Sequence, residues 1–276
     1  WCGAGAGMEV ASIVAHTGEE PFLTGGRGVG NVFFSRCNMA CVFCQNHSIS
    51  HQNHGVLYSP EELAERLLEL QDQGCPTVGL VSPTQYLAPV RETIVIARNR
   101  GLSVPVVWNS NAFESISALR TLDGLVDIYL PDLKYADDAY SVEYSSAPGY
   151  VAASRAAVME MWRQAGVLKI EGGLARKGLC VRHLVLPNGI SGTDDILGFI
   201  AGISKEITVS LMSQYNPLFR AGEHPLLSRR LWQSEYWRAV ETAEALGLSN
   251  TLIQEPETSP ETFIPDFGRK NPFEHP

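Results

Sequence analysis

Three cysteines on one short loop are the residues whose types and spacing carry the most chemistry in this sequence. Cys37, Cys41 and Cys44 form a CxxxCxxC pattern directly after an apolar segment. Three thiolates held this closely can share one iron–sulfur cube, although a four-iron cluster normally takes four cysteines. The spacing therefore predicts a [4Fe-4S] cluster in which one iron is left open to another ligand.

Zinc binding is the alternative chemistry for the same three cysteines. Structural zinc sites usually pair a CxxC with a second CxxC or with two histidines. His47, His51 and His54 follow the cysteines, so one imidazole could supply a fourth ligand. We expect these histidines to be polar loop residues, which favours the iron–sulfur interpretation.

The composition is that of an ordinary globular protein and excludes several functions. The 276 residues are 45% apolar and 18% charged, enough for one large α/β domain or two small ones. A net charge of −9 argues against binding to nucleic acid or to an anionic membrane. No apolar stretch approaches the ~18 residues of a membrane-spanning helix. Six cysteines over this length form no disulfide framework, so we expect a reduced, cytoplasmic protein.

Apolar strand-like runs alternate with amphipathic helical segments along the chain. This alternation predicts a parallel sheet with right-handed crossovers. We therefore expect an α/β fold, an open and partial (β/α)6 TIM-like barrel with parallel strands. Six such units suit this fold better than a closed eight-fold barrel. We expect an N-terminal extension over 1–30, incomplete at its start, the barrel over 31–250, and a C-terminal strap over 251–276. The predicted strands are 31–36, 77–82, 104–109, 126–131, 179–187 and 206–212, and the predicted helices are 60–73, 86–100, 114–121, 151–165, 192–202 and 228–246.

Polar side chains follow the predicted strands at the end where chemistry collects in barrels and open α/β sheets. Turns are polar in general, but an Asp and a Lys two residues apart, directly after the apolar run 128–131, are less expected. A surface salt bridge between these two is the ordinary alternative, and such a bridge contributes little. The strand-end residues are Ser82 and Thr84, Asn109 and Asn111, and Asp132 and Lys134.

The cysteine spacing, with Phe43 directly before the third cysteine, resembles the radical S-adenosylmethionine (radical SAM) superfamily. Over 16–217 the chain resembles, more narrowly, the pyruvate formate-lyase activating enzyme-like radical SAM proteins. The resemblance implies a [4Fe-4S] cluster on Cys37, Cys41 and Cys44, with the amino and carboxylate groups of SAM on its open iron, and a partial barrel. The segments that carry the resemblance are 16–21, 37–46, 81–84, 127–135, 182–187 and 212–215.

Each part of the implied SAM needs a different kind of side chain. The ammonium suits the Ser82 and Thr84 hydroxyls as acceptors, although many radical SAM proteins place a Gly-Gly-Glu here and this chain lacks that carboxylate. Lys134 or Arg182 could pair with the SAM carboxylate, and Arg182 offers bidentate geometry. The adenine suits an apolar slot beside Phe43. Candidates for the ribose hydroxyls are Asn109, Asn111 and Asp132.

Several other residues in these segments are expected to be structural. Arg182 and His183 alternate along a strand, so only one of them can face the barrel interior. We expect His183 to be a structural donor rather than a base, and Tyr215 suits either a hydroxyl at the mouth or core packing. The segment 16–21 is expected to cover the cluster side, and Cys2 to be the last member of a cysteine-rich stretch.

The resemblance also implies the reaction, that of a radical SAM oxidoreductase. A flavodoxin- or ferredoxin-type donor reduces the cluster, SAM is cleaved to methionine and a 5′-deoxyadenosyl radical, and the radical abstracts hydrogen from a substrate. The leading hypothesis is abstraction from a glycine of a partner glycyl radical enzyme. The alternatives are radical modification of a small molecule or peptide, and a non-catalytic metal-binding scaffold.

Overall fold

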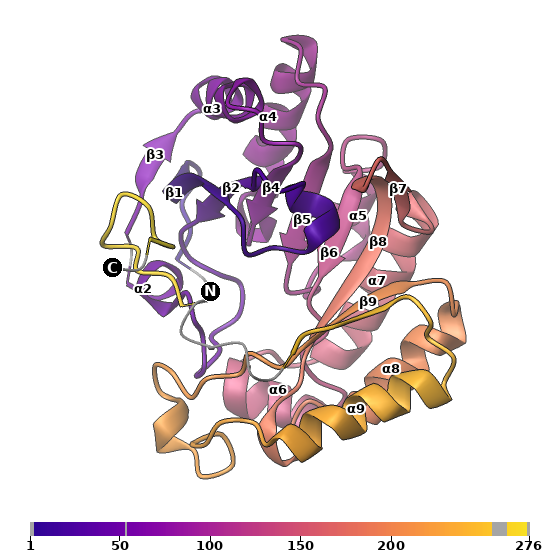
Figure 1. The fold of residues 1–276 in the computed structure, drawn as a ribbon. Coiled ribbons are helices and arrows are strands. Elements are labelled where there is room, and N and C mark those ends of the chain that lie inside the picture. The colour runs from indigo at the N-terminus through magenta and orange to yellow at the C-terminus, as the bar shows by residue number, and fades with distance from the viewer. Residues whose placement is uncertain (1–2, 53, 256–263, 275–276) are drawn as a thin grey trace.

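The computed structural model describes residues 3–52, 54–255 and 264–274, and its largest feature is one open, curved sheet (Figure 1). The strand order is β10-β9-β8-β6-β5-β4-β2-β1-β3, and β7 pairs with β8 off this path. The neighbouring strands β2, β4, β5, β6, β8, β9 and β10 pair in parallel. Strand β1 is antiparallel to both β2 and β3, and β7 is antiparallel to β8. The parallel strands are β2 (Val29–Phe34), β4 (Val78–Val81), β5 (Val106–Ser110), β6 (Ile128–Pro131), β8 (Leu174–Leu184), β9 (Thr208–Met212) and β10 (Thr251–Ile253); the others are β1 (Met8–His16), β3 (Val56–Tyr58) and β7 (Lys169–Glu171).

Helices α3, α4, α5, α7 and α8 pack on the outer face of the sheet (Figure 1). None of the helices in the described part of the chain is long and apolar enough to cross a membrane. The helices are α1 (Pro21–Thr24), α2 (His47–Ser50), α3 (Pro60–Asp72), α4 (Leu87–Asn99), α5 (Ile116–Arg120), α6 (Asp138–Ser145), α7 (Tyr150–Ala165), α8 (Thr193–Ile203) and α9 (Gln233–Ala245).

The predicted open α/β barrel with parallel strands is confirmed, because each predicted strand and helix has a counterpart in the structure. Four strands and three helices were not predicted. Two of these elements, β1 and α1, lie within the expected N-terminal extension and pack on the barrel. Strand β8 begins at Leu174, earlier than predicted, because β7 forms an antiparallel hairpin with its first residues. The unpredicted elements are β1, β3, β7, β10, α1, α2 and α6.

Helix α3 begins where its local sequence predicts. The Ser59 hydroxyl accepts the N–H of Glu62 at 3.2 Å, and the Glu62 carboxylate accepts the N–H of Ser59 at 2.8 Å. This reciprocal pair satisfies two amide groups that the first turn of a helix leaves unpaired. Leu63 and Leu67 then lie on one face and are fully buried against the sheet.

Alternation along the strands separates an outer apolar core from an inner polar surface. Trp108 and Tyr129 point outward and are fully buried beneath the helices. On the inner face, Asn31 lies in register with Gly79 of the next strand. A Cβ atom at Gly79 would lie 2.0 Å from the Asn31 Oδ1 atom, so the glycine makes room for this interior amide.

Helix α1 closes the end of the barrel at which the parallel strands begin, since β1, which leads into it, runs antiparallel to β2. Phe22 and Leu23 of α1 are buried against Val107, Ile128 and Cys180 of three different strands. An apolar plug therefore fills this end of the barrel.

The C-terminal residues 264–274 lie against β1 and β2, far from the β10 edge (Figure 1, yellow). The Phe273 ring stacks on His16 with centroids 3.6 Å apart. Phe267 and Phe273 also contact Phe33, at centroid distances of 5.4 and 5.6 Å. Of the expected C-terminal strap over 251–276, the first residues form β10 of the sheet, and below we use the name strap for residues 264–274 alone.

The α1 plug should contribute strongly to stability. Replacing Leu23, which is 1% exposed, leaves a cavity among three strands, so we expect Leu23→Ala to lower the free energy of unfolding by about 2–5 kcal/mol. Leu226→Ala is the control, because Leu226 is 43% exposed and its loss should change stability by about 0.5 kcal/mol or less. Urea denaturation followed by circular dichroism measures both, and equal effects would contradict the role of the plug.

Candidate active site

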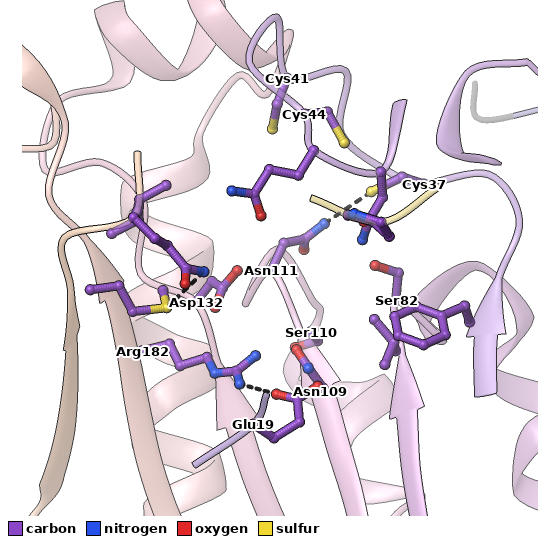
Figure 2. Close-up of a pocket in the computed structure, with 18 of the residues that line it drawn as sticks. Glu19, Cys37, Cys41, Cys44, Ser82, Asn109, Ser110, Asn111, Asp132 and Arg182 are labelled. Carbon is purple, nitrogen blue, oxygen red and sulfur yellow. Dashed lines mark hydrogen bonds and ion pairs between the residues drawn. The ribbon is translucent and has the colours of Figure 1, made fainter. Parts of the chain in front are cut away.

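A cavity of about 220 Å³ lies between the cysteine loop and the carboxyl ends of the parallel strands (Figure 2). Figure 2 shows the cysteines at one end of it and Glu19, Asn109 and Arg182 at the other. Of the site residues predicted from the sequence, only Thr84 does not line this cavity. Those that line it are Cys37, Cys41, Phe43, Cys44, Ser82, Asn109, Asn111, Asp132, Lys134 and Arg182.

Helix α6, which the sequence did not predict, holds the cysteine loop in place. The N–H groups of Ala40 and Val42 donate to the carbonyl oxygens of Ser145 and Tyr144, both at 2.9 Å. The Ser145 hydroxyl also donates to the Cys41 sulfur at 3.0 Å. The backbone of the loop is therefore fixed by an element about a hundred residues further along the chain.

Cys41 is buried, Cys37 and Cys44 are partly buried, and each of the three thiols has a hydrogen-bond partner. Asn111 Nδ2 donates to the Cys37 sulfur at 3.4 Å, and the Cys44 sulfur lies 3.3 Å from the Ser50 hydroxyl. Burial is the main cause that raises the pKa of Cys37 to about 12, and the negative charge of a Cys41 thiolate is the second cause. The same two causes raise the pKa of Cys44 to about 11. Since metal ligands are thiolates, binding of a metal centre here must displace protons.

The histidines that follow the cysteines do not line the cavity. The rings of His47 and His51 stack on Phe219, with centroids 4.9 and 5.1 Å apart, and His54 is exposed. His47 Nδ1 lies 3.2 Å from the Cys44 carbonyl oxygen. Within the described residues, no three His, Cys, Asp or Glu side chains converge to hold a single metal ion.

Asp132 and Lys134 form an ion pair that faces the cavity rather than the surface. Lys134 Nζ lies 2.7 Å from Asp132 Oδ2, with side chains 16% and 24% exposed. Burial alone would lower the pKa of Lys134, but the charges of Asp132 and Cys41 raise it above its usual value. The second carboxylate oxygen, Asp132 Oδ1, is buried without a hydrogen-bond partner in the described part of the chain. An unpaired buried acceptor beside a cavity fits a ligand that donates a hydrogen bond.

Tyr150 connects the ends of β5 and β6, a role that the sequence analysis missed. Its hydroxyl lies 3.0 Å from the Asn111 carbonyl oxygen and 2.9 Å from that of Asp132. The same hydroxyl accepts the N–H of Lys134 at 2.9 Å. Tyr150 is the first residue of α7 and carries no sequence signal for this role.

Ser82 holds a backbone conformation that non-glycine residues rarely adopt, with φ of +55°. Its N–H donates to the Asn109 carbonyl oxygen at 2.9 Å, and Gln85 Nε2 donates to its carbonyl oxygen at 2.8 Å. Gln85 Nε2 also donates to the carbonyl oxygen of Arg36, at 3.0 Å, just before the cysteine loop. The loop after β4 is therefore tied both to β5 and to the cysteine loop.

Thr84 points toward a buried carboxylate instead of the cavity. Its hydroxyl donates to Glu114 Oε1 at 3.0 Å, and Glu114 also accepts from Trp108 Nε1 at 2.9 Å and from the Ser110 hydroxyl at 2.7 Å. Burial raises the pKa of Glu114 despite these three donors. Thr84 and Glu114 thus connect the loops after β4 and β5.

Arg182 lies in the barrel interior and is paired with two acidic residues of this chain. Arg182 Nε and Nη2 each lie 2.8 Å from one carboxylate oxygen of Glu20, and Nη2 also contacts Glu19. Asn31 Nδ2 donates to Glu19 Oε1 at 2.7 Å. Burial disfavours the ionised form of Glu20, but the charge of Arg182 and its hydrogen bonds keep the pKa of Glu20 below its usual value.

This pairing changes the expectation for the segment 16–21. The sequence predicts a cover on the cluster side, whereas Glu19 and Glu20 enter the barrel from the plugged end and pair with Arg182. Glu19 and Arg182 line the cavity at the end away from the cysteines. Arg182 lies 162 residues after Glu20 in the sequence, so no local pattern indicates this pairing.

His183 and Tyr215 are structural residues. His183 faces away from the interior that Arg182 occupies; its Nδ1 lies 2.7 Å from the Leu133 carbonyl oxygen and its Nε2 lies 2.9 Å from the Thr193 hydroxyl. Burial lowers the pKa of His183 to about 4, so the ring is neutral at pH 7. The Tyr215 hydroxyl donates to a backbone oxygen at 2.7 Å, which favours the core-packing alternative.

Removing the buried arginine should cause a loss of stability that depends on pH. Arg182→Met leaves two buried carboxylates without their cation, and we expect a loss of about 3–5 kcal/mol at pH 7. In the native protein, the pKa of Glu20 is lowered from its usual value of 4.5. The stability that this lowering gives is fully present above pH 4.5 and is lost as the pH falls through the lower pKa of the folded state. Without Arg182, burial should raise this pKa, so stability should instead fall as the pH rises.

The difference between native protein and variant should therefore be largest at neutral pH and shrink toward pH 4. Urea denaturation at both pH values measures it. Arg238→Met is the matched control, because the Arg238–Asp194 pair is exposed and contributes little. A loss for Arg182→Met that is the same at both pH values would contradict an electrostatic role for the pair.

Comparison with known proteins places the chain in a family. The model of the radical SAM superfamily matches residues 31–199. A protein of Methanocaldococcus jannaschii, described as uncharacterized, is 32% identical over 244 residues, which cover 84% of this chain and 66% of that relative. The chain thus spans slightly less than two thirds of this relative's length.

Solved structures share the fold at low sequence identity. Streptococcus suis SuiB bound to S-adenosylmethionine has a TM-score of 0.56 at 11% identity, covering 80% of this chain and 48% of SuiB. The FeFe-hydrogenase maturase HydG from Carboxydothermus hydrogenoformans has a TM-score of 0.55 at 14% identity, covering 78% of this chain and 50% of HydG. Methylornithine synthase has a TM-score of 0.53 at 17% identity, covering 79% of this chain and 60% of the synthase. By its sequence match and its open barrel, the chain belongs to the radical SAM superfamily, whose members bind a [4Fe-4S] cluster and S-adenosylmethionine.

Proposed function

We propose that Cys37, Cys41 and Cys44 hold a [4Fe-4S] cluster, that SAM occupies the adjoining cavity, and that the protein catalyses hydrogen abstraction from a substrate. The observation that supports this proposal most directly is that three cysteine thiols lie together at one end of a cavity lined by strand-end polar groups. When bound, the reduced cluster supplies the electron that cleaves SAM into methionine and a 5′-deoxyadenosyl radical.

The residues that line the cavity fit both the iron–sulfur cluster and SAM. Three soft sulfur ligands suit an iron–sulfur cluster and leave one iron position for SAM. The buried acceptor Asp132 Oδ1, which has no partner among the described residues, suits a ribose hydroxyl. Phe43 is 6% exposed and lines the cavity, so it offers an apolar surface to the adenine.

The contacts of the remaining candidates favour some roles over others. Lys134 is the better partner for the SAM carboxylate, since it is paired with one carboxylate, that of Asp132, whereas Arg182 is paired with two, those of Glu19 and Glu20. Ser82 lines the cavity and suits the SAM ammonium, whereas Thr84 supports the loop through Glu114. Asn109 lines the cavity as a second candidate for the ribose, and Asn111 supports the Cys37 sulfur.

The barrel itself limits side reactions of a radical. Phe22 and Leu23 close the far end against water, and Pro265 and Phe273 of the strap wall the cavity. Exclusion of water and of stray hydrogen donors is the protein's contribution to cofactor chemistry of this kind. A flavodoxin- or ferredoxin-type protein is the proposed one-electron donor.

A glycine of a partner glycyl radical enzyme is the leading substrate. A small molecule or free peptide is the second candidate, because the α1 plug closes one end of the barrel and Pro265 and Phe273 of the strap line the cavity. The structure of SuiB bound to its precursor peptide SuiA, with a TM-score of 0.53 at 12% identity, is a case of this fold with a peptide ligand.

Mutating one cysteine of the loop should abolish the reaction. Anaerobically reconstituted protein should contain about four irons per chain and release 5′-deoxyadenosine from SAM after reduction with dithionite. Cys41→Ala should lose the SAM-dependent change in the EPR signal and lower 5′-deoxyadenosine to background. Cys75→Ala is the matched control, since Cys75 is buried in the apolar core away from the cavity.

Stoichiometric zinc with no SAM cleavage in the native protein would sink the proposal and favour a metal-binding scaffold. Equal loss of product in both cysteine variants would indicate general destabilisation instead of loss of a cluster ligand.

A further inference from the structure

The side-chain amide of Gln214 lies at the wall of the cavity beside the cysteine loop and has a donor to spare. Gln214 follows β9 and lines this cavity together with Met212. Its oxygen, Oε1, accepts a hydrogen bond from Gln254 Nε2 at 2.9 Å. In the described part of the chain, its nitrogen, Nε2, has only the Met212 sulfur as a partner, at 3.9 Å. A thioether is a weak acceptor, so this nitrogen keeps its capacity to donate to a ligand.

The orientation of the Gln214 amide follows from its neighbours. The oxygen and nitrogen of a glutamine amide have the same shape, so hydrogen-bond partners decide which is which. The N–H of Ser213, which can only donate, lies 2.8 Å from Gln254 Oε1. The nitrogen of Gln254 therefore faces Gln214 and meets its oxygen. One backbone N–H thus orients two side-chain amides in sequence and leaves Gln214 Nε2 beside Met212, at the cavity wall.

Gln254 is held in place by the sheet and by α9. It directly follows β10, which pairs in parallel with β9. The N–H of Gln254 donates to the Tyr236 hydroxyl at 2.7 Å, and this hydroxyl donates to the carbonyl oxygen of Leu211 at 2.9 Å. Tyr236 belongs to α9 and is fully buried. The position of Gln254 beside Gln214 is therefore fixed by the fold.

The same wall of the cavity adjoins the apolar surface proposed for the adenine. Gln214 directly precedes Tyr215, whose ring packs against Phe43 with centroids 5.8 Å apart. Phe43 and Gln214 both line the cavity. An adenine on the Phe43 surface would therefore have the end of β9, with its oriented amide, as a neighbour.

The adenine edge is the part of SAM that this amide fits. Gln214 Nε2 is a donor, and its Oε1 has a second lone pair beyond the one that Gln254 uses. Adenine presents a ring-nitrogen acceptor next to its N6 amino donor, and a glutamine amide pairs with that arrangement through two hydrogen bonds. The other polar groups of SAM suit different residues, since a carboxylate requires a cation such as Lys134 and the ribose hydroxyls suit Asp132 Oδ1.

We propose that Gln214 recognises the amino edge of the adenine of SAM, and that Gln254 is the positioning residue that orients the Gln214 amide for it. This inference rests on the proposed function, which places SAM in the cavity, and adds the side chain that selects adenine over other bases. Hypoxanthine carries an oxygen in place of the N6 amino group and a proton on N1, so it reverses the order of donor and acceptor. A fixed amide rejects that reversed order, because a donor then faces a donor.

The test compares two ligands that undergo no radical chemistry, S-adenosylhomocysteine and S-inosylhomocysteine, whose base is hypoxanthine. Isothermal titration calorimetry on anaerobically reconstituted protein gives Kd for each. We expect the native protein to prefer the adenosyl compound by about tenfold or more, which is the discrimination that a two-bond glutamine–adenine pair supplies. Equal affinity for the two compounds, or no binding of either, would overturn the inference.

Two variants separate recognition from positioning. Gln214→Leu removes the amide, so the two compounds should bind with Kd values within about threefold of each other. Gln254→Glu keeps an acceptor for the Ser213 N–H but can no longer donate to Gln214. The Gln214 amide should then turn over to donate to the new carboxylate, and the preference should reverse in favour of the inosyl compound.

Gln233→Leu is the matched control, because Gln233 is the exposed first residue of α9 and does not line the cavity. It should leave both Kd values unchanged. A native preference that survives in Gln214→Leu would show that another group reads the base. Loss of preference without reversal in Gln254→Glu would contradict the positioning role, since a merely structural glutamine could weaken binding but could not invert the choice of base.

Dithionite-driven release of 5′-deoxyadenosine from SAM, measured in the same preparations, separates this inference from the proposed function. SAM cleavage without discrimination between the two compounds leaves the proposed chemistry standing and defeats the role of Gln214. Discrimination that follows the variants as expected, without SAM cleavage, gives the reverse result.

Discussion

The barrel interior depends on one buried ion pair. Arg182 of β8 is held by Glu19 and Glu20, which precede α1, so the pair fixes the plugged end of the barrel to the middle of the sheet. A charged group at this depth is tolerated only when it is paired and hydrogen-bonded. Asn31 supplies a further hydrogen bond to Glu19, and the absence of a side chain at Gly79 leaves room for that amide.

The opposite end of the barrel is organised by polar groups that link neighbouring loops. Tyr150 connects the ends of β5 and β6, Glu114 connects the loops after β4 and β5, and Gln85 connects the loop after β4 to the cysteine loop. None of these three residues lines the cavity. Their hydrogen bonds fix the backbone from which the lining residues project, which is how a rigid scaffold positions reactive groups.

The sequence predicted what depends on local pattern and missed what depends on distant contacts. Strand–helix alternation located the six central units, and the cysteine spacing located the cavity. Strands of three residues such as β3, and the antiparallel β1, give little periodic signal. The sequence predicted that only one of Arg182 and His183 faces the interior, but the partners of Arg182 could not be found because pairing across 162 residues leaves no local trace.

The support that α6 gives to the cysteine loop has a consequence for how the protein is made. Ser145 lies 104 residues after Cys41, and ribosomes add about 5–20 residues per second. The loop therefore leaves the ribosome about 5–20 s before the helix that shapes it. During that interval its thiols are exposed to solvent, and delivery of iron and sulfide to the folded site has to wait for the middle of the chain.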